Sequence, residues 1–536
     1  RRSETGWEKL DVDSQIAAHR SRGMHSKEKS LPSILSLITK DQFEMITTDP
    51  ERPVIIQGSA GSGKTTVALH RLAWLLHENN SPVKAEKTRV IVMNKSLAVY
   101  VSATLPSMGI EGVQTTTFNS WAMSIIRKSV RGQPFFKFLN IPSFVEELKF
   151  SEEILKALAG WVDKQELNLD EEIKKQFASR TAHLDNWMKS KGKPLLPRLR
   201  DFSHEVKNSK LPDAEKQQKL GFIKKQISNL EDYLQDLYNL LSDSEHLKKY
   251  LPANPKLVSN LEYLKRLTEK NRLKKNLDYF DMSLVLRLIQ LKNGGLPDGS
   301  GGTVSLDHIV IDEAQDFGPV EFAIMMGAVS DKRQVTIVGD VAQKILFARK
   351  FIGWNRVVEY LGLDDDAIIQ LEVSFRCTVP IMTLAHKVAG DPKKVEGRAG
   401  PDPIWQESEN YVDLIENLAD WSRGLLRADP YKLVALICRY PKQAMELKEE
   451  MEGYLPGEVR LGHRDQFSFE PGVLVTNIHQ VKGLEFDSVA LVEPDEENYP
   501  AKREESRNMI YVGITRTQED LLLATIRPYS SVLAGH

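Results

Sequence analysis

The chain has 536 residues, 41% of them hydrophobic and 27% charged, which excludes a disordered or fibrous protein. Its formal net charge of −2 excludes an overall basic field, so a polyanion such as DNA would have to bind at local basic patches. This length predicts about three or four domains.

The cysteine count and the apolar runs narrow the class of protein further. Cys377 and Cys438 are too few for a disulfide scaffold and suit the reducing cytosol. No apolar run reaches the roughly 20 residues that span a bilayer, so we expect a cytoplasmic protein without a membrane partner. The chain begins at Arg1, with neither an initiator Met nor a signal peptide, and a missing N-terminal piece is a hypothesis.

The first 50 residues lead up to a strand. Residues 1–30 are polar and weakly patterned, which predicts a loose helix or a linker. Residues 31–46 have helical spacing and carry Gln42, whose amide has the donor and the acceptor needed to contact adenine. A surface glutamine is the alternative interpretation of this residue taken alone.

A strand, a glycine-rich turn and a helix follow one another between residues 54 and 76. This is the order of a P-loop, in which backbone N–H groups and the positive end of the helix dipole bind phosphate. We expect Lys64 to reach the β- and γ-phosphates and the Thr65 hydroxyl to bind Mg²⁺. The sequence therefore predicts a nucleoside triphosphate site formed by Gly58, Ser59, Ala60, Gly61, Ser62, Gly63, Lys64, Thr65 and Thr66.

A continuous apolar run at residues 89–93 predicts a second buried strand of a parallel sheet, and we expect residues 114–118 to form a third strand. Residues 135–275 then change character, since they are charged, helical and mostly without strand signals. Apolar residues from Leu220 to Leu241 alternate spacings of three and four, which predicts one helix in a coiled-coil arm. We expect its partner to be the helix that carries Leu257, Leu261, Leu264 and Leu267.

Basic residues gather at two places in the same helical segment. The alternatives are solvated helix faces and contacts to a phosphate backbone, and the sequence leaves both open. The residues concerned are Lys189, Lys191 and Lys193, and then Lys265, Arg266, Lys270, Arg272, Lys274 and Lys275.

The α/β pattern resumes after a glycine-rich connector at residues 294–302. We expect buried strands at 308–311 and 335–338, then a domain break near residue 360. A second set of strands is expected at 368–373, 433–438, 473–475, 489–492 and 521–524. The sequence thus predicts an α/β fold with parallel sheets, divided into an N-terminal segment at 1–30, a first domain at 31–134 and 276–360, a helical, partly coiled-coil insertion at 135–275 and a second domain at 361–536.

Acidic residues follow the strand at 308–311 at its carboxyl end, where parallel sheets bind ligands. Asp312 is placed to bind Mg²⁺ and Glu313 to polarise the attacking water, two roles that phosphoryl transfer needs. Gln343 follows the next strand and is expected to sense the γ-phosphate. Arg376 and Arg516 would come from the second domain, where such an arginine speeds transfer by about 10³–10⁵ and ties it to domain closure.

Taken together and in order, these elements resemble the motifs of superfamily 1 helicases of the UvrD/Rep group. The surroundings of the P-loop, including Ala68-Leu69-His70-Arg71, are most similar to the HelD branch of that group. The resemblance is carried by Gln42, the P-loop, Thr117-Phe118-Asn119-Ser120, Asp312-Glu313-Ala314-Gln315, Gly339-Asp340 with Gln343, Ser374-Phe375-Arg376, the run from His479 to Phe486 and the run from Tyr511 to Arg516.

The resemblance implies two RecA-like domains, ATP as the nucleotide and Glu313 as the base. It implies that Gln42 contacts adenine, that Phe375 stacks on it where the family usually has Tyr, and that Glu485 binds the ribose. The γ-phosphate would be surrounded by Gln343, Arg376 and Arg516. A single-stranded nucleic acid would run past Thr117, Phe118, Thr476 and His479, with Phe347 in place of an aromatic residue that is absent at Leu346.

Three functions remain open on the sequence alone. The first is a monomeric 3′-to-5′ DNA helicase or translocase that hydrolyses ATP with Mg²⁺ and has single-stranded DNA as its partner. The second is a HelD-like ATPase that remodels or recycles RNA polymerase. The third is a nucleotide-gated binding protein, against which the complete set of catalytic residues argues. The lack of a large insertion at residues 377–472 favours the second function, and the lack of a coiled coil in residues 1–30 favours the first.

Overall fold

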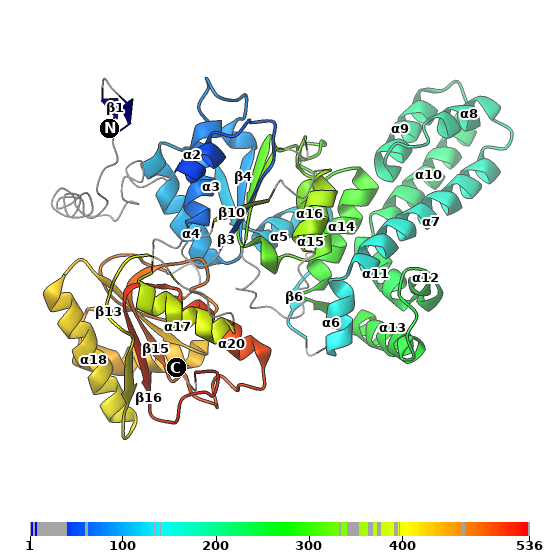
Figure 1. Cartoon of the computed structure of the whole chain (residues 1–536). Helices are drawn as coiled ribbons and strands as arrows, with labels where there is room; N and C mark the ends of the chain where they lie inside the picture. Colours follow the sequence, from blue (N-terminus) through cyan, green and yellow to red (C-terminus); the bar gives the residue numbers. More distant parts are fainter. Residues whose placement is uncertain are drawn as a thin grey trace.

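The computed structural model has two α/β lobes and a helical region that extends from the first lobe (Figure 1). Several predicted site residues lie outside the part of the chain that it describes, namely Ser59, Ala60, Gly61, Ser62, Gln343, Phe347, Phe375 and Arg376. The structure describes residues 2–3, 6–7, 40–58, 63–132, 134–139, 141–331, 334–339, 353–362, 368–371, 377–390, 395, 397–463 and 467–533.

The first lobe contains a six-stranded parallel sheet in the order β10-β3-β9-β8-β4-β5. Most of its strands read as apolar runs because helices cover both faces of the sheet. The strands are β3 (Val54–Gly58), β4 (Thr88–Val92), β5 (Gln114–Thr117), β8 (His308–Ile311), β9 (Val335–Gly339) and β10 (Ile368–Leu371). The covering helices are α2 (Lys40–Ile46), α3 (Lys64–Leu75), α4 (Lys95–Thr104), α5 (Phe118–Ser129), α14 (Asp281–Asn293), α15 (Pro319–Met326) and α16 (Trp354–Leu361).

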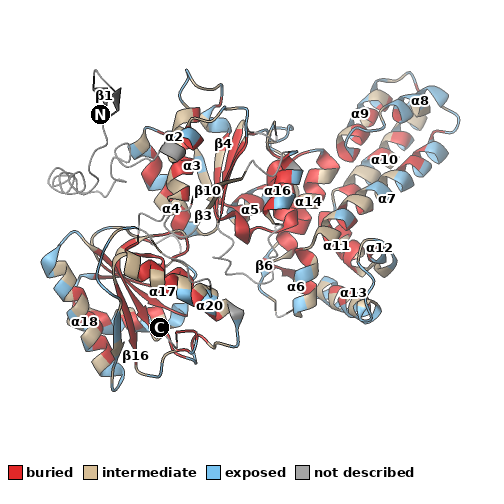
Figure 2. Ribbon diagram, viewed as in Figure 1, coloured by how far each residue is buried: buried red, intermediate tan, exposed pale blue. Residues whose placement is uncertain are grey.

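Alternate residues of each strand in this sheet contribute to opposite cores. Ile56 and Val90 belong to the core that includes residues of α3 and α4, whereas Ile55 and Ile91 belong to the core that includes residues of α5 and α14. Figure 2 shows the strands and the inner helix faces as buried. This packing fixes the strand ends relative to α3, which carries Lys64.

Strand β10 corrects one expectation from the sequence. We expected it to begin the second set of strands, and this was wrong, because Ile368 pairs with Ile55 and Leu371 with Gly58 in the first sheet. Buried parallel strands have similar compositions, so the sequence alone does not indicate which sheet a strand joins. The first sheet therefore extends past residue 360.

The second lobe contains a six-stranded parallel sheet in the order β11-β16-β15-β12-β14-β13. Its predicted strands at 433–438, 473–475, 489–492 and 521–524 are confirmed, with longer bounds for the last three. The sheet consists of β11 (Ile404–Glu407), β12 (Leu433–Cys438), β13 (Val459–Leu461), β14 (Gly472–Asn477), β15 (Phe486–Val492) and β16 (Thr517–Thr525). One face carries α17 (Val379–Ala389) and α20 (Glu504–Ile514), and the other carries α18 (Tyr411–Ala428) and α19 (Pro441–Tyr454). The predicted α/β class is confirmed.

A helical region occupies most of residues 143–274, and the short strands β6 (Phe136–Lys137) and β7 (Leu277–Asp278) pair where the chain enters and leaves it. At the other end of the chain, β1 (Arg2–Ser3) and β2 (Gly6–Trp7) form an antiparallel pair. The helices are α6 (Ser143–Lys149), α7 (Glu152–Gln176), α8 (Thr181–Lys189), α9 (Leu195–Asn208), α10 (Asp213–Leu230), α11 (Tyr233–Ser242), α12 (Ser244–Lys248) and α13 (Leu257–Lys274).

The single coiled-coil helix expected from Leu220 to Leu241 is wrong. Helix α10 ends at Leu230. The Asp232 carboxylate then accepts a hydrogen bond from the Gln235 backbone N–H and caps a new helix, α11. Helix α10, which carries the first part of the apolar pattern, packs against α9. Helix α11, which carries the second part, packs against α13, the expected partner. A heptad pattern identifies the apolar face but not the continuity of the helix that carries it. No helix in the described residues is both long and apolar enough to cross a membrane.

Candidate ATP site between the two lobes

The P-loop connects β3 to α3, as the sequence predicts. Gly63 has φ +80°, a left-handed conformation that favours glycine, and it leads directly into the first turn of α3. The ammonium group of Lys64 donates a hydrogen bond of 2.9 Å to the Gly58 carbonyl, so it reaches back to the end of β3. The Thr65 hydroxyl donates to Asp312 at 3.0 Å, which joins the P-loop to the end of β8.

A buried arginine positions the segment that carries Gln42. The Arg71 side chain is fully buried, and its guanidinium donates to carbonyls at the end of α2 and in the turn between α2 and β3. Burial lowers the pKa of Arg71 to about 10, which leaves the group charged at neutral pH. The Gln42 amide nitrogen lies 3.7 Å from the position that a Cβ atom would take on Gly63. The carbonyls bound by Arg71 are those of Met45, Ile46, Thr48, Asp49 and Arg52.

Asp312 and Glu313 lie in the interior of the site, 3% and 7% exposed. Burial, and then the neighbouring Glu313 carboxylate, raise the pKa of Asp312. Burial would also raise the pKa of Glu313, but the charges of Lys482, Lys64 and Arg516 outweigh it and lower that pKa. Glu313 is therefore held in its ionised form, which is the form that can accept a proton.

The backbone of Glu313 has φ +53°, one of the few non-glycine positions with a left-handed conformation in the described residues. Such strain persists only where the surroundings determine it. Here the Gln315 amide donates to the Glu313 carboxylate, and Gly339 at the end of β9 leaves room for it. A Cβ atom on Gly339 would lie 2.6 Å from Gln315 Oε1. The turn after β8 thus orients the Glu313 carboxylate, and the neighbouring strand β9 leaves room for the Gln315 side chain that binds it.

The second lobe contributes a buried lysine to this cluster of carboxylates. Lys482 lies in the loop between β14 and β15 and is 3% exposed. Its ammonium group donates to Asp316 and lies 3.9 Å from a Glu313 oxygen. Charges this well buried are stabilised only by close partners. The contact therefore ties the second lobe to the turn after β8 in the first lobe.

Arg516 lies at the start of β16 and is 5% exposed. Its guanidinium donates to the carbonyls of Val512 and Leu484, each at 3.1 Å, and its positive charge acts on Glu313. The predicted Arg516 is thus brought to the site. Glu485, predicted to bind the ribose, accepts a hydrogen bond from the Gln518 amide at 3.3 Å.

The two lobes also touch beside this cluster. The Asn94 amide at the start of α4 donates to the Lys482 carbonyl at 3.1 Å, and the Ser96 hydroxyl donates to Gln480 at 2.8 Å. Gly483 has φ +79°, and a Cβ atom there would lie 2.6 Å from a methyl group of Leu97. The loop that carries Lys482 therefore fits closely against the first lobe.

The residues present fit a magnesium ion held jointly with phosphate oxygens. Thr65 and Asp312 offer a hydroxyl and a carboxylate 3.0 Å apart, and oxygen ligands of this kind suit Mg²⁺. The raised pKa of Asp312 shows that its buried charge lacks full compensation, which a cation would supply. No cluster of three or more His, Cys, Asp or Glu residues that could hold a metal occurs in the described part of the chain. Two protein ligands match a metal that Mg–nucleotide sites bind largely through phosphate and water.

Three of the residues predicted to lie along a nucleic acid have internal roles. Thr117 caps α5 by accepting from the Ser120 backbone N–H at 3.1 Å. Phe118 is 2% exposed and contacts the rings of Trp121 and Phe317. Thr476 is fully buried. Nucleic-acid contacts of these residues stay predictions.

His479, the fourth described residue of that predicted path, is exposed. Its Nε2 atom lies 3.1 Å from the Arg439 guanidinium. Desolvation and then the Arg439 charge lower the pKa of His479, so its imidazole is uncharged near neutral pH in the free protein. A nucleic-acid contact at this position also stays a prediction.

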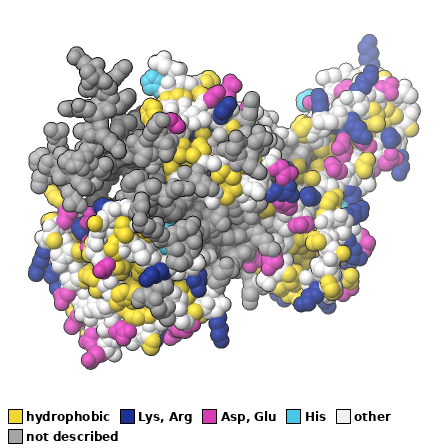
Figure 3. All heavy atoms as spheres, viewed as in Figure 1, with side chains coloured by type: hydrophobic (Ala, Val, Ile, Leu, Met, Phe, Trp, Pro, Cys, Tyr) yellow, Lys and Arg dark blue, Asp and Glu magenta, His cyan; other side chains and the backbone are white. Residues whose placement is uncertain are grey.

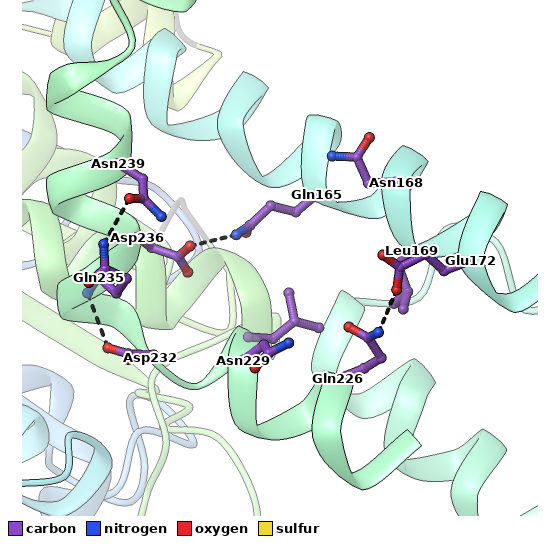
Figure 4. Close-up of a pocket in the computed structure, with 11 residues that line it drawn as sticks. Gln165, Asn168, Leu169, Glu172, Gln226, Asn229, Asp232, Gln235, Asp236 and Asn239 are labelled. Atoms are coloured by element: carbon purple, nitrogen blue, oxygen red, sulfur yellow. Dashed lines mark hydrogen bonds between the residues drawn. The ribbon is translucent and has the colours of Figure 1, made fainter. Parts of the chain in front are cut away.

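A polar cavity of about 340 Å³ lies in the helical region, between α7, α10 and α11, apart from the P-loop (Figure 4). Its amides and carboxylates bond to one another, since Gln165 donates to Asp236 and Gln226 to Glu172. Asp236 also binds the buried ammonium group of Lys292. This network stabilises the packing of the three helices.

A family model described as the UvrD/REP helicase N-terminal domain matches residues 38–349, more than half of the chain. The chain belongs to the UvrD/REP helicase family. A second model, the UvrD-like helicase C-terminal domain, matches residues 457–528 in the second lobe. Membership in the UvrD/REP family agrees with two RecA-like domains, whose sheets and P-loop are described above. The HelD branch is not distinguished by these matches.

Curated relatives of this UvrD/REP family member are distant. A probable DNA helicase II homolog of Rickettsia conorii is 24% identical over 383 residues, 69% of this chain and 47% of that protein. A homolog of the same description from Mycoplasma capricolum is 22% identical over 441 residues, 79% of this chain and 51% of that protein. The chain thus spans about half the length of these relatives.

Two more partial matches involve shorter segments. ATP-dependent DNA helicase UvrD2 of Mycobacterium tuberculosis is 26% identical over 157 residues, 26% of this chain and 22% of that protein. Among solved structures, the C-terminal domain of a possible DNA helicase from Lactobacillus plantarum is 23% identical, with a TM-score of 0.26, and covers 30% of this chain and 93% of that one. A TM-score this low carries no argument about the fold.

Sequence reasoning missed two residues that organise the site, Lys482 and Arg71. Both stand inside motif runs of the sequence, Lys482 between His479 and Phe486 and Arg71 at the end of Ala68-Leu69-His70-Arg71. Their partners did not appear in the sequence, because Asp316 lies 166 residues from Lys482 and the carbonyls bound by Arg71 carry no side-chain signal. The one feature of the sequence that pointed to Lys482 was its place in a loop after a predicted strand of the second domain.

Proposed function

We propose that this UvrD/REP family member hydrolyses ATP between its two lobes and uses the cycle to move along single-stranded DNA. One observation supports this most directly: Lys482 and Arg516 of the second lobe both act on Glu313 of the first. Glu313 therefore has these two charged partners only while the lobes are together. Hydrolysis would then follow lobe closure, as in a motor.

Each charged group of the site has one role in the proposal. Lys64 binds the β- and γ-phosphates, and Thr65 and Asp312 hold Mg²⁺, which would neutralise charge on the phosphate oxygens. Glu313 orients the attacking water and accepts its proton. Arg516, together with the predicted Gln343 and Arg376, would stabilise charge on the γ-phosphate in the transition state.

The nucleoside would be held by residues from both lobes. Gln42 would contact the adenine edge, which agrees with its position beside Gly63. Phe375 would stack on the base and Glu485 would bind the ribose. The DNA strand would pass Thr117, Phe118, Phe347, Thr476 and His479, with 3′-to-5′ polarity.

The test is ATP turnover by the full chain with and without single-stranded DNA. We expect stimulation by DNA, and we expect Glu313→Gln to lower turnover by about 10²–10⁴ while nucleotide still binds. Glu407→Gln, at an exposed position of β11, is the matched control and should keep full turnover. Equal turnover in the wild type and Glu313→Gln would refute the proposal. Unwinding of 3′-tailed but not 5′-tailed duplexes would establish polarity.

A second candidate function, remodelling of RNA polymerase, has one observation in its favour. Between α17 and β14, the described chain holds only elements that belong to or cover the second sheet, with no added helical domain. The UvrD-type enzymes that the chain resembles carry a large insertion there, and HelD-type proteins do not. Turnover stimulated by RNA polymerase but not by DNA would favour this candidate over a DNA motor.

A further inference from the structure

The polar cavity between α7, α10 and α11 has, among the described residues, no basic side chain in its lining. Six amide side chains, three carboxylates and two leucines surround its volume of about 340 Å³. Figure 3 shows acidic and basic side chains mixed over the helical region, so no general field of one sign covers this face. What the cavity can bind therefore depends on the groups that line it.

The carboxylates of the lining outnumber the cations that bind them. Asp236 accepts a hydrogen bond from the buried ammonium group of Lys292. Glu172 and Asp232 accept hydrogen bonds from neutral donors, and neither makes a salt bridge within the residues that the structure describes. Three carboxylates and one ammonium group leave an excess of two negative charges, which a positively charged ligand would neutralise.

The amides add hydrogen-bond acceptors that the internal network leaves unused. The Gln165 amide nitrogen donates to Asp236 at 2.6 Å, whereas the Gln165 Oε1 atom is buried and has no hydrogen-bond partner in the described chain. Asn168 and Asn229 also line the cavity, and their side chains make no hydrogen bond to the other described residues. A buried acceptor without a partner costs free energy, which a donor on a ligand would recover.

The unpaired carboxylates lie at opposite ends of the cavity (Figure 4). Glu172 lies at one end, and Asp232 and Asp236 lie at the other. On α7, Gln165 binds Asp236 and stands two turns before Glu172, which separates the two ends by about 10 Å along the helix. A ligand that neutralises both ends therefore needs two positive charges on an extended chain.

Negative ends and apolar surface in one cavity match one class of small ligand. A linear aliphatic polyamine carries ammonium groups, which donate hydrogen bonds and accept none, and methylene segments between them. The methylene groups would pack on Leu169 and Leu230, which are 4% and 7% exposed. A metal ion needs oxygen ligands that converge on one point, and no group of three or more His, Cys, Asp or Glu residues in the described chain offers them.

We propose that the cavity between α7, α10 and α11 binds a linear polyamine, with one ammonium group at Glu172 and another at Asp232. The inference goes beyond the proposed function and does not depend on it, since the cavity lies apart from the P-loop. The ligand would connect α7 with the segment where the chain passes from α10 to α11. Binding would therefore stiffen the helical region at this break.

The first experiment is calorimetric titration of the full chain with spermidine, without nucleotide, because polyamines also bind triphosphates. We expect saturable binding of one spermidine per chain. Glu172→Gln and Asp232→Asn should each weaken binding about 10- to 100-fold, since each removes a charged hydrogen bond. The amide in Asp232→Asn still caps α11. The matched control is Glu171→Gln, whose carboxylate pairs with Lys174 outside the cavity, and it should bind as the wild type does.

The second experiment locates the ligand by hydrogen exchange. Spermidine should slow deuterium uptake in residues 229–236 of the wild type and of Glu171→Gln, but not of the double variant Glu172→Gln/Asp232→Asn. Protection only elsewhere, such as in the turn after β8 with its buried carboxylates, would overturn the proposal. So would displacement of spermidine by Mg²⁺ at equal ionic strength, because binding would then depend on charge alone.

The outcome is separable from that of the proposed function. Glu313→Gln, which tests ATP hydrolysis, should bind spermidine as the wild type does. Circular dichroism of the cavity variants should match the wild type, and so should their ATP turnover without spermidine. Absence of saturable binding, or an equal loss of binding in Glu171→Gln and Glu172→Gln, would overturn the proposal and leave the motor proposal untouched.

Discussion

At the scale of single residues, Glu313 is held ionised by charges that come from distant parts of the chain. Lys64 belongs to the P-loop, whereas Lys482 and Arg516 belong to the second lobe. The strand-end pattern of Asp312 and Glu313 was readable in the sequence, because parallel strands end at the ligand-binding edge. The contact of Lys482 with Asp316 was not, because nothing local indicates which carboxylate a lysine meets across an interface.

Replacement of Lys482 tests this charge arrangement. Lys482→Met should lower ATP turnover by about 10²-fold, because one preorganised charge beside the reacting groups is lost. Steady-state kinetics with saturating ATP measure the effect. Lys432→Met is the control, since Lys432 also binds carboxylates within the second lobe but lies away from the P-loop. Equal losses in both variants would mean that Lys482 acts only through stability.

Buried His308 predicts a dependence of stability on pH. Burial and then the Arg71 charge lower the pKa of His308 to about 3, from an ordinary value of 6.5. Above pH 6.5 the imidazole is neutral in both states. As the pH falls below 6.5, only the unfolded chain takes up the proton, so stability is lost until about pH 3.

From pH 7 to pH 5, this effect removes roughly 2 kcal/mol of the free energy of unfolding. His308→Gln, which keeps a polar group near the Thr336 hydroxyl, should remove this part of the pH dependence. Denaturant unfolding of both proteins at the two pH values measures it. Parallel stability curves for the wild type and the variant would contradict the prediction.

At the scale of elements, the break between α10 and α11 shows where apolar spacing misleads. Leu220 to Leu241 carry one periodic pattern, but Asp232 caps a new helix inside it. The pattern correctly indicated the buried face and the partner α13. It did not indicate the break, because one capping residue changes the path of the chain without changing the spacing of apolar residues.

The variant Asp232→Ala distinguishes two helices from one. Loss of the cap should destabilise α11 by about 1 kcal/mol and speed hydrogen exchange of its first turn. Mass spectrometry of deuterium uptake in residues 231–242 measures this, with α10 as the internal reference. If a continuous helix ran through this position, alanine would slow exchange there, because alanine favours helix interiors.

At the scale of the whole molecule, the lobes are joined by a loop that fits closely against α4. Gly483 has φ +79° and approaches Leu97. Gly483→Ala should strain the backbone by about 1–2 kcal/mol and push the loop outward, so that ATP turnover falls about tenfold. The stability of each lobe should change little.

A double variant separates the two causes of that loss. Leu97→Ala/Gly483→Ala removes the steric contact but not the backbone strain, so it should recover part of the turnover. Gly453→Ala in α19 is the control, because a Cβ atom there meets no neighbour within 4 Å. No recovery in the double variant would mean that contact with Leu97 does not limit closure.

The sequence by itself determined the α/β class, the P-loop, the strand-end carboxylates and the order of the motifs, because these depend on local spacing and on the chemistry of phosphate. Only the tertiary structure decided that β10 joins the first sheet, that Lys482 meets Asp316 and that Arg71 holds the turn after α2. These contacts join residues far apart in the chain. Their energies come from desolvation and charge pairing, which depend on what is packed nearby and not on the sequence around each residue.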